Sequence, residues 1–255
     1  MDIIAYLLAF LAPGAFVYID LFAAFINGLN GALLSQRSDH YKRGMFTVVG
    51  ILVMTLFGGI GGGTARDILL NEVPGSWTNP WYLILLILAW IIGLRLAFDK
   101  GQKFRETFYQ ILTAFSLPWY AVVGVEKGLQ AEWPYLGAIL LGVVGPTAGR
   151  YLIDITSGVP AKQLVKGEWF IGTAVLTSFS FIVLRSGAFG RPGFALDFIP
   201  ATLIAFLIGF VFRMAAIWFA WEEPMPKVPA AWLEKVPMRE TLKEKMQPGW
   251  EPQED

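Results

Sequence analysis

Apolar residues dominate seven segments of the chain, and each segment is about as long as a helix that crosses a bilayer. Such a helix needs about 20 mostly apolar residues. The seven segments are 20–36, 44–65, 80–98, 107–126, 133–153, 168–185 and 197–221. The pattern therefore predicts an all-α integral membrane protein with seven transmembrane helices.

The N-terminal residues 1–19 are also apolar, but Pro13–Gly14 interrupts them and Asp20 follows directly. We expect them to form an N-terminal extension of the first helix that is kinked at Pro13, or a segment that lies at the membrane interface. They carry neither the basic start nor the small-residue cleavage site of a secretory signal, so we expect them to remain in the mature protein.

The connections between the segments predict an orientation. Lysine and arginine gather in alternate connections and in the tail, at Arg37, Lys42, Arg43, Lys100, Lys103, Arg105, Lys162, Lys166, Lys227, Lys235, Arg239, Lys243 and Lys245. The opposite connections hold only Arg66, Lys127, Arg150, Arg185 and Arg191. Because cytoplasmic loops carry the excess of basic residues, we expect a multi-pass inner (plasma) membrane protein with its N-terminus outside and its C-terminus in the cytoplasm.

Composition limits the kinds of chemistry that the chain can perform. Apolar residues make up 55% and charged residues 16%, as is typical of membrane proteins, and 20 basic residues balance 20 acidic ones. Because the net charge is zero, the chain has no positive electrostatic potential that would attract nucleic acid. The absence of cysteine excludes disulfides and cysteine metal sites. The one histidine, His40, lies in the polar stretch QRSDHYKRG. We therefore expect neither an enzyme nor a metal or other cofactor.

A weak internal repeat divides the chain. LFGGIGGGTARD at the end of the second segment aligns with LLGVVGPTAGRY at the end of the fifth, so that Gly58 matches Gly142 and Arg66 matches Arg150. Less clearly, Gly31 aligns with Gly124. A repeat of three helices ends on the opposite side of the membrane from its start, so the two units must be inverted. We expect units at 20–106 and 107–196, a seventh helix at 197–221 and a polar cytoplasmic tail at 222–255.

Inverted repeats place their functional site near mid-membrane, at helices that glycine or proline interrupts. The matching interruptions are Gly58–Gly63 in the second segment and Gly142–Pro146 in the fifth, each followed by charge. Intramembrane charge costs about 2.5–3.5 kcal/mol on insertion scales and usually faces the bundle interior. The candidate pore and gating residues are Gly61, Gly62, Gly63, Arg66, Asp67, Glu126, Lys127, Gly145, Pro146, Arg150 and Asp154. Two alternatives stay open: the glycines form only a close helix contact, and the charges only end their helices.

The motif GGGTARDILLNEVP, with its weaker second copy and a seventh helix, resembles the prokaryotic trimeric intracellular cation (TRIC) channel family. The domain of that family is also catalogued as a putative glycine transporter. The resemblance covers about residues 20–215. It implies a homotrimer of seven-helix protomers, with an hourglass pore inside each protomer that the second and fifth helices shape. It also implies that basic residues near the constriction take part in gating.

Residue by residue, the first motif matches the family at Gly61, Gly62, Gly63, Arg66 and Asp67, and Lys127 falls where the family has a basic residue in its fourth helix. The second motif, GPTAGRYLID, departs from the family pattern because Pro146 and Thr147 replace glycines and Tyr151 follows Arg150. Asp154 stands one helical turn later, where it can supply the missing acid.

The resulting hypothesis is passive conduction of monovalent cations, K⁺ and Na⁺, with membrane lipid as the surroundings of the protein. Carbonyl groups freed in a broken helix can replace part of the hydration shell of an ion. The alternative is a carrier for glycine or a similar small amino acid, in which an arginine and helix N-termini bind the carboxylate while Asp67 holds the amine.

Overall fold

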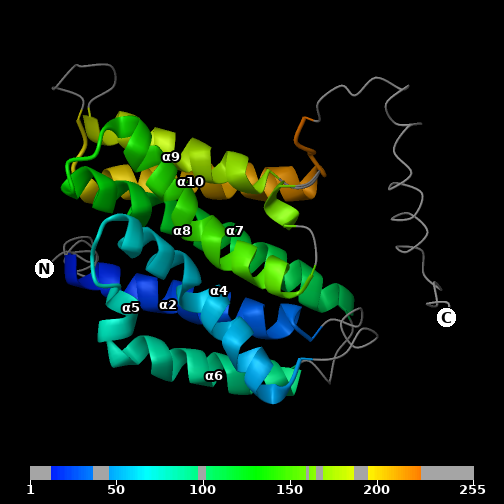
Figure 1. Cartoon of the computed structure of the whole chain (residues 1–255). Helices are drawn as coiled ribbons and strands as arrows, with labels where there is room; N and C mark the ends of the chain where they lie inside the picture. Colours follow the sequence, from blue (N-terminus) through cyan, green and yellow to red (C-terminus); the bar gives the residue numbers. More distant parts are fainter. Residues whose placement is uncertain are drawn as a thin grey trace, which may run out of the picture. The chain divides into compact units, whose positions relative to one another are not determined.

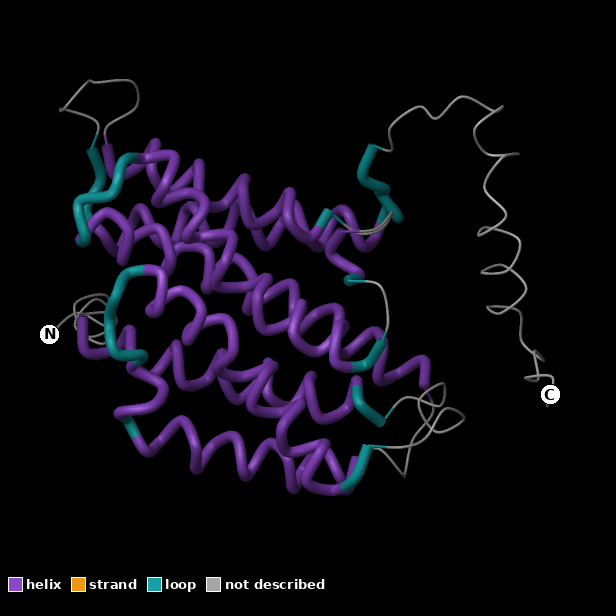
Figure 2. The backbone as a smooth tube through the Cα atoms, viewed as in Figure 1, coloured by secondary structure: helices purple, strands orange, loops and turns teal. Residues whose placement is uncertain are grey.

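The computed structural model describes residues 13–36, 46–96, 102–158, 161–164, 169–186 and 195–224. All regular elements in these ranges are helical (Figures 1 and 2). They are α2 (Pro13–Leu34), α4 (Val48–Leu69), α5 (Gly75–Thr78), α6 (Pro80–Leu96), α7 (Gln102–Gln130), α8 (Tyr135–Thr156), the 3₁₀ turn η1 (Lys162–Leu164), α9 (Phe170–Ser186) and α10 (Phe198–Trp218).

Each of the seven predicted segments coincides with one of the long helices of the described chain. Three of them, α4, α8 and α10, are by themselves long and apolar enough to cross a membrane. Asp20–Leu34, α6 and α9 are shorter apolar helices. Helix α2 includes residues 13–19, whereas residues 1–12 of the predicted N-terminal extension lie outside the described residues, so the kink expected at Pro13 stays a prediction. His40 and the tail beyond residue 224 lie outside the described residues.

Helices that are far apart along the chain are neighbours in the bundle (Figure 1). Helix α6 packs on α2 and α4, α4 packs on α8, and α8 packs on α7. Helices α9 and α10 pack on each other and on α7, on the side away from α6. The contact between α4 and α8 therefore lies near the middle of the bundle.

Glycines set the spacing of the central helices. A side chain at Gly31 or Gly58 would strike the carbonyl oxygen of Met54 or Asn27, respectively, so α2 and α4 touch backbone to backbone. Helices α7 and α8 touch in the same way, because a Cβ atom at Gly124 would lie 2.6 Å from the carbonyl oxygen of Leu141. Small residues permit such close approach of helices within a membrane.

The predicted breaks in the second and fifth helices are wrong. Helix α4 is one continuous helix through Gly58–Gly63, and α8 is continuous through Gly142–Pro146. Instead, this glycine segment is where α4 meets α8: a side chain at Gly62 would strike the carbonyl oxygen of Gly145. Packing against neighbouring backbone keeps these weak helix formers helical, because tertiary contacts override intrinsic propensity.

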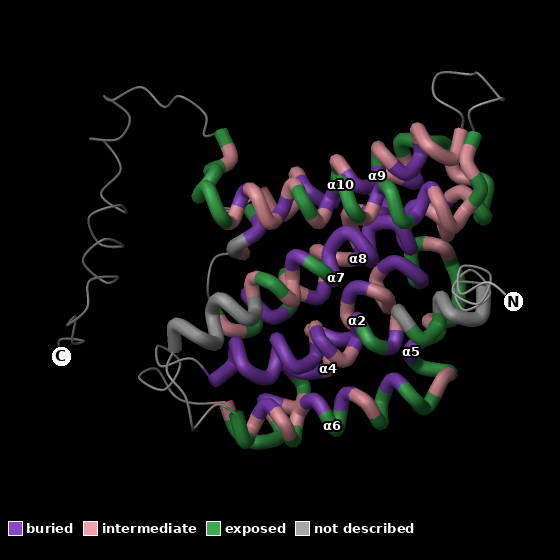
Figure 3. Tube along the Cα trace, turned by 180° about the vertical axis from the view of Figure 1, so that it is seen from behind, coloured by how far each residue is buried: buried purple, intermediate pink, exposed green. Residues whose placement is uncertain are grey.

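The outer faces of the bundle are exposed (Figure 3), and many of the residues there are large and apolar. Large apolar side chains are exposed along the outer helices, for example Ile84 and Leu88 on α6 and Leu207 and Val211 on α10. Buried positions include polar and charged residues, namely Asn30, Thr55, Arg66, Asp67, Ser116, Asp154, Thr173, Thr177, Ser178, Thr202 and Arg213. An apolar exterior, with polar and charged residues kept inside the bundle, suits a lipid environment.

Candidate functional site

Two cavities lie beside the glycine segment of α4. The first, which we call the charged cavity, has a volume of about 170 Å³. Its polar lining comes from α2, α4, α5, α6 and α7 and consists of Asp20, Arg66, Asp67, Ser76, Tyr82, Tyr120 and Lys127. The second, the asparagine cavity, has about 30 Å³ and contains Asn27, Asn30, Thr113, Ser116, Tyr120 and Arg150 among its lining residues.

Asp67 is the centre of an ion-pair network in the charged cavity. Its Oδ1 accepts from Arg66 Nε at 2.8 Å and from Lys127 Nζ at 2.9 Å, and its Oδ2 accepts from the backbone N–H of Gly75 at 3.2 Å. Lys127 also reaches Glu72, with Nζ 3.2 Å from Oε2. The structure thus brings together three predicted site residues from two helices, and it commits both oxygens of Asp67.

Asp20 is a member of this site that the sequence reasoning missed. Its Oδ2 accepts a hydrogen bond from the Tyr82 hydroxyl, whereas its Oδ1 is buried and has no hydrogen-bond partner. The buried Nη1 of Arg66 has none either. The signal was present, because an acid inside an apolar stretch is a candidate for function. Because the predicted first helix starts at residue 20, Asp20 stands at the end of that helix in the prediction and not inside the membrane.

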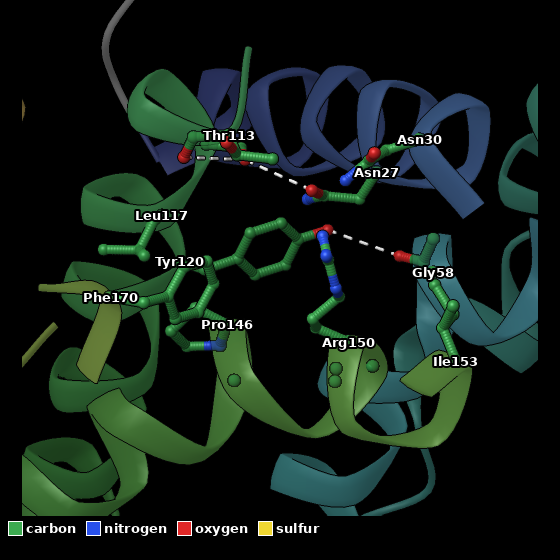
Figure 4. A pocket seen from close by; sticks show the side chains of 16 residues that line it. Asn27, Asn30, Gly58, Thr113, Leu117, Tyr120, Pro146, Arg150, Ile153 and Phe170 are labelled. Atoms are coloured by element: carbon green, nitrogen blue, oxygen red, sulfur yellow. Dashed lines mark hydrogen bonds between the residues drawn. The ribbon is translucent and has the colours of Figure 1, made fainter. Parts of the chain in front are cut away.

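The asparagine cavity is polar but holds less charge (Figure 4). Ser116 Oγ donates to Asn27 Oδ1 at 3.2 Å, which links α7 to α2. Arg150 extends from α8 toward the same space. The predicted residues Gly145 and Pro146 also line this cavity, on the α8 side.

Arg150 and Asp154 form the counterpart of the Arg66–Asp67 pair. Arg150 Nε lies 3.2 Å from Asp154 Oδ1, and Asp154 is only 3% exposed. With its amide turned to satisfy both neighbours, Gln163 donates to Asp154 Oδ2 at 3.1 Å. Asp154, one helical turn after Arg150, therefore forms the ion pair that Tyr151, at the position next to the arginine, cannot form.

Three residues belong to both cavities: Gly59 and Gly63 on α4 and Tyr120 on α7. Tyr120 is 5% exposed, and its hydroxyl lies 3.4 Å from the carbonyl oxygen of Gly59. Of these three, the sequence reasoning selected only Gly63.

Other predicted site residues lie elsewhere. Glu126 lines neither cavity; its Oε1 is 3.7 Å from Arg185 Nη2 and 3.2 Å from Gln130 Nε2. Gly61 packs against Gly149 and Leu152 of α8. Gly62 lines the asparagine cavity, yet its closest neighbour is the Gly145 backbone, so the close-contact reading of the glycines holds for Gly62. Within the described ranges, no group of three or more acidic or histidine side chains could hold a metal ion.

Comparison with known proteins adds relatives of the whole bundle. A family model described as glycine transporter matches residues 17–97. A UPF0126 membrane protein of Vibrio cholerae is 28% identical over 181 residues, which are 67% of this chain and 73% of the relative. The UPF0126 inner membrane protein YadS of Escherichia coli K12 is 22% identical over 82% of this chain and 94% of its own length.

Solved structures show the same fold. A structure of the TRIC trimeric intracellular cation channel orthologue from Rhodobacter sphaeroides has a TM-score of 0.68 and 25% identity, covering 81% of this chain and 99% of that one. A structure from work on conductance through TRIC cation channels has a TM-score of 0.68 and 22% identity, covering 84% of this chain and 98% of that one.

An all-helical bundle with an apolar exterior, matched along most of its length by membrane proteins, defines the class: this is a multi-pass α-helical membrane protein. Its solved relatives are channels and not enzymes. Within that class, residues 17–97 match the glycine transporter family model, and the fold is similar to that of the solved TRIC channels.

Proposed function

We propose that the protein conducts monovalent cations, K⁺ and Na⁺, passively along a path inside each protomer. The observation that carries this proposal is the pair of polar cavities that follow one another along α4 and share Gly59, Gly63 and Tyr120. The path lies between α2, α4, α7 and α8. The described TRIC relatives are cation channels, and their likeness to this fold supports the same class of function here.

The site residues take different roles along this path. Asp67 holds Arg66 and Lys127 in place, and Glu72, which also pairs with Lys127, brings the sum of these four formal charges to zero. Gly63 leaves the space open, since a Cβ atom there would meet only Arg66 Nη2, at 3.8 Å. Gly145, Pro146 and Arg150 line the second half of the path, with Asp154 fixing the arginine. Gly61 and Gly62 set the distance between α4 and α8. Glu126 lies outside the cavities, where it pairs with Arg185 and links α7 to α9.

We further propose that the chain is built from two inverted three-helix repeats, α2–α4–α6 and α7–α8–α9, followed by α10. The aligned glycines support this. Gly31 and Gly58 bring α2 against α4, and their partners in the alignment, Gly124 and Gly142, bring α7 against α8. In addition, the family match at 17–97 covers the first of the two units. In this proposal the polar tail at 222–255 belongs to neither repeat.

The assembly that we propose is a homotrimer in the inner membrane, with the N-terminus outside and the C-terminus in the cytoplasm. The trimeric description of the Rhodobacter sphaeroides orthologue supports the first part, and the distribution of lysine and arginine supports the second.

Recording from purified protein in planar bilayers tests the conduction proposal. We expect unitary currents in KCl and in NaCl that Gly63→Val reduces, because the added side chain enters both cavities without striking backbone. Gly50→Val at the start of α4 is the matched control, since a Cβ atom there meets its nearest neighbour at an ordinary 3.4 Å and faces neither cavity. Protein that incorporates as trimers yet never conducts would exclude a channel.

A carrier for a small zwitterion is the second candidate, and one observation favours it. Asp67 already accepts from three donors, whereas Asp20 Oδ1 and Arg66 Nη1, on residues that line the same cavity, have no hydrogen-bond partner. A ligand with an ammonium and a carboxylate group would satisfy both, whereas K⁺ would satisfy only the acid. Both atoms are buried, so the two side chains must rotate to reach a ligand. Buried polar groups without partners cost about 1–3 kcal/mol each, which such a ligand would recover.

Proteoliposomes distinguish the two candidates. Saturable counterflow of labelled glycine without ionic current would support the carrier, and its loss in Asp20→Asn would assign the ammonium site. Glu132→Gln, in the exposed turn between α7 and α8, is the control and should keep wild-type counterflow. Unitary currents without counterflow would support the channel.

A further inference from the structure

We propose that Tyr120 is the barrier between the charged cavity and the asparagine cavity, and that movement of its ring joins them. This inference rests on the proposed function in one respect, because it places the barrier of the proposed path. It holds for a channel and for a carrier alike, since both need a continuous hydrated route at some stage.

The lining residues carry the first step of the argument. Gly59, Gly63 and Tyr120 are the residues that the two described cavities share. Two of them have no side chain. The phenol ring of Tyr120 is therefore the one side chain common to both spaces in the described part of the protein. Because that ring is 5% exposed, it fills the junction.

Polarity on either side of the ring gives the second step. Asp20 and Tyr82 line the charged cavity, and Asn27 and Ser116 line the asparagine cavity. Figure 4 shows the ring reaching across from α7 toward α4. Groups that bind water lie on both sides, and a mostly apolar ring lies between them. Moving the ring would let the two hydrated regions merge.

The way the ring is held gives the third step. Its hydroxyl donates to the carbonyl oxygen of Gly59 at 3.4 Å, which is long for a hydrogen bond between O–H and oxygen. The backbone of Tyr120 is held more firmly, because it lies inside the continuous helix α7. The hydroxyl also has a hydrogen-bond partner in the Asn27 side chain, so the ring can rotate while α7 stays in place once these two contacts of its hydroxyl open.

Osmotic water permeability of proteoliposomes, measured by stopped flow, tests the barrier without requiring ion conduction. We expect Tyr120→Ala to raise water permeability several-fold over the wild type. Phe181→Ala is the matched control, because Phe181 is a fully buried ring in the core between α7, α9 and α10 and lines neither cavity. It should leave permeability at the wild-type value. If Tyr120→Ala does not assemble, Tyr120→Leu replaces it and should give a smaller rise.

Tyr120→Phe tests the hydroxyl contact in planar bilayers. Losing one hydrogen bond should raise the open probability by about two- to tenfold, with the unitary conductance unchanged because the ring remains. Unchanged water permeability in both Tyr120→Ala and Tyr120→Leu would overturn the barrier and leave the conduction proposal standing. Absence of currents in every variant, together with increased water permeability, would refute conduction and support the barrier.

Discussion

At the scale of single residues, the acids of this bundle differ in how many hydrogen-bond partners they have and in how deeply they are buried. Asp67 accepts from Arg66, Lys127 and the backbone of Gly75, and it is 2% exposed. Glu72 accepts only from Lys127, and its side chain is 50% exposed. The two acids share the same lysine but differ in burial, so removal of their charges should have different consequences.

Asp67→Asn should cost about 3–5 kcal/mol of folding free energy, because it leaves the buried Arg66 guanidinium without the carboxylate that pairs with it directly. Glu72→Gln should cost less than about 1 kcal/mol, since an exposed ion pair contributes little. Thermal unfolding of both variants in the same detergent measures the difference. Equal melting temperatures would mean that Asp67 is not the anchor of the network.

Adjacent glycines in α4 provide a second contrast. At Gly62 a methyl group would strike the carbonyl oxygen of Gly145, so Gly62→Ala must push α4 and α8 apart and lower the melting temperature. At Gly63 the nearest neighbour is Arg66 Nη2 at 3.8 Å, so Gly63→Ala should be neutral or stabilising by up to about 1 kcal/mol through helix propensity. The same thermal assay compares them, and a larger loss for Gly63→Ala would contradict the packing.

Most of the charged members of the site were predictable from the sequence, because a charge inside an apolar segment costs free energy and is therefore easy to recognise. Arg66, Asp67, Lys127, Arg150 and Asp154 all stand out as charges in or near apolar segments, and the structure brings them into two ion-pair clusters. The partners of these groups were not predictable, because they depend on which helices become neighbours. Glu126 pairs with Arg185 across α7 and α9, a contact that no local pattern indicates.

At the scale of helices, the lengths of the apolar segments predicted where the helices lie, whereas the glycines led to a wrong prediction of helix breaks. Each apolar segment corresponds to a long helix in the described part of the chain, since burial in lipid forces the backbone to satisfy its own hydrogen bonds. GGIGGG and GPTAG were expected to break their helices, yet α4 and α8 continue through them. Sequence alone does not distinguish glycine that frees a backbone from glycine that lets another backbone approach.

The aligned glycines make a prediction at this scale. Gly31→Ala and Gly124→Ala should both destabilise the protein, because each new methyl group would press on a neighbouring carbonyl group, that of Met54 or Leu141. Gly75→Ala should be silent, as a Cβ atom there meets nothing within 4 Å. Thermal unfolding tests this set. A silent Gly124→Ala would remove the structural support for the proposed repeat.

At the scale of the whole molecule, the fold class followed from composition and pattern, whereas the position of the site followed only from packing. The sequence predicted a site near α4 and α8, and both cavities lie beside α4. That Asp20 and Tyr120 complete the site depends on how α2 and α7 pack around α4, which their own segments do not encode.

Orientation is the property of the whole molecule that the sequence predicts most directly, and the chain is suited to testing it because it has no cysteine. Single cysteines at Glu132, in the turn between α7 and α8, and at Glu222, after α10, should lie on opposite sides of the membrane. A membrane-impermeant maleimide applied to intact spheroplasts should label Glu132→Cys and leave Glu222→Cys unlabelled until the cells are lysed. The physical reason is that basic residues resist translocation, so the tail with its five lysines and arginines stays inside. The cysteine-free parent controls for background. The reverse labelling pattern would invert the bundle and place the ion-pair network of Asp67 on the cytoplasmic side.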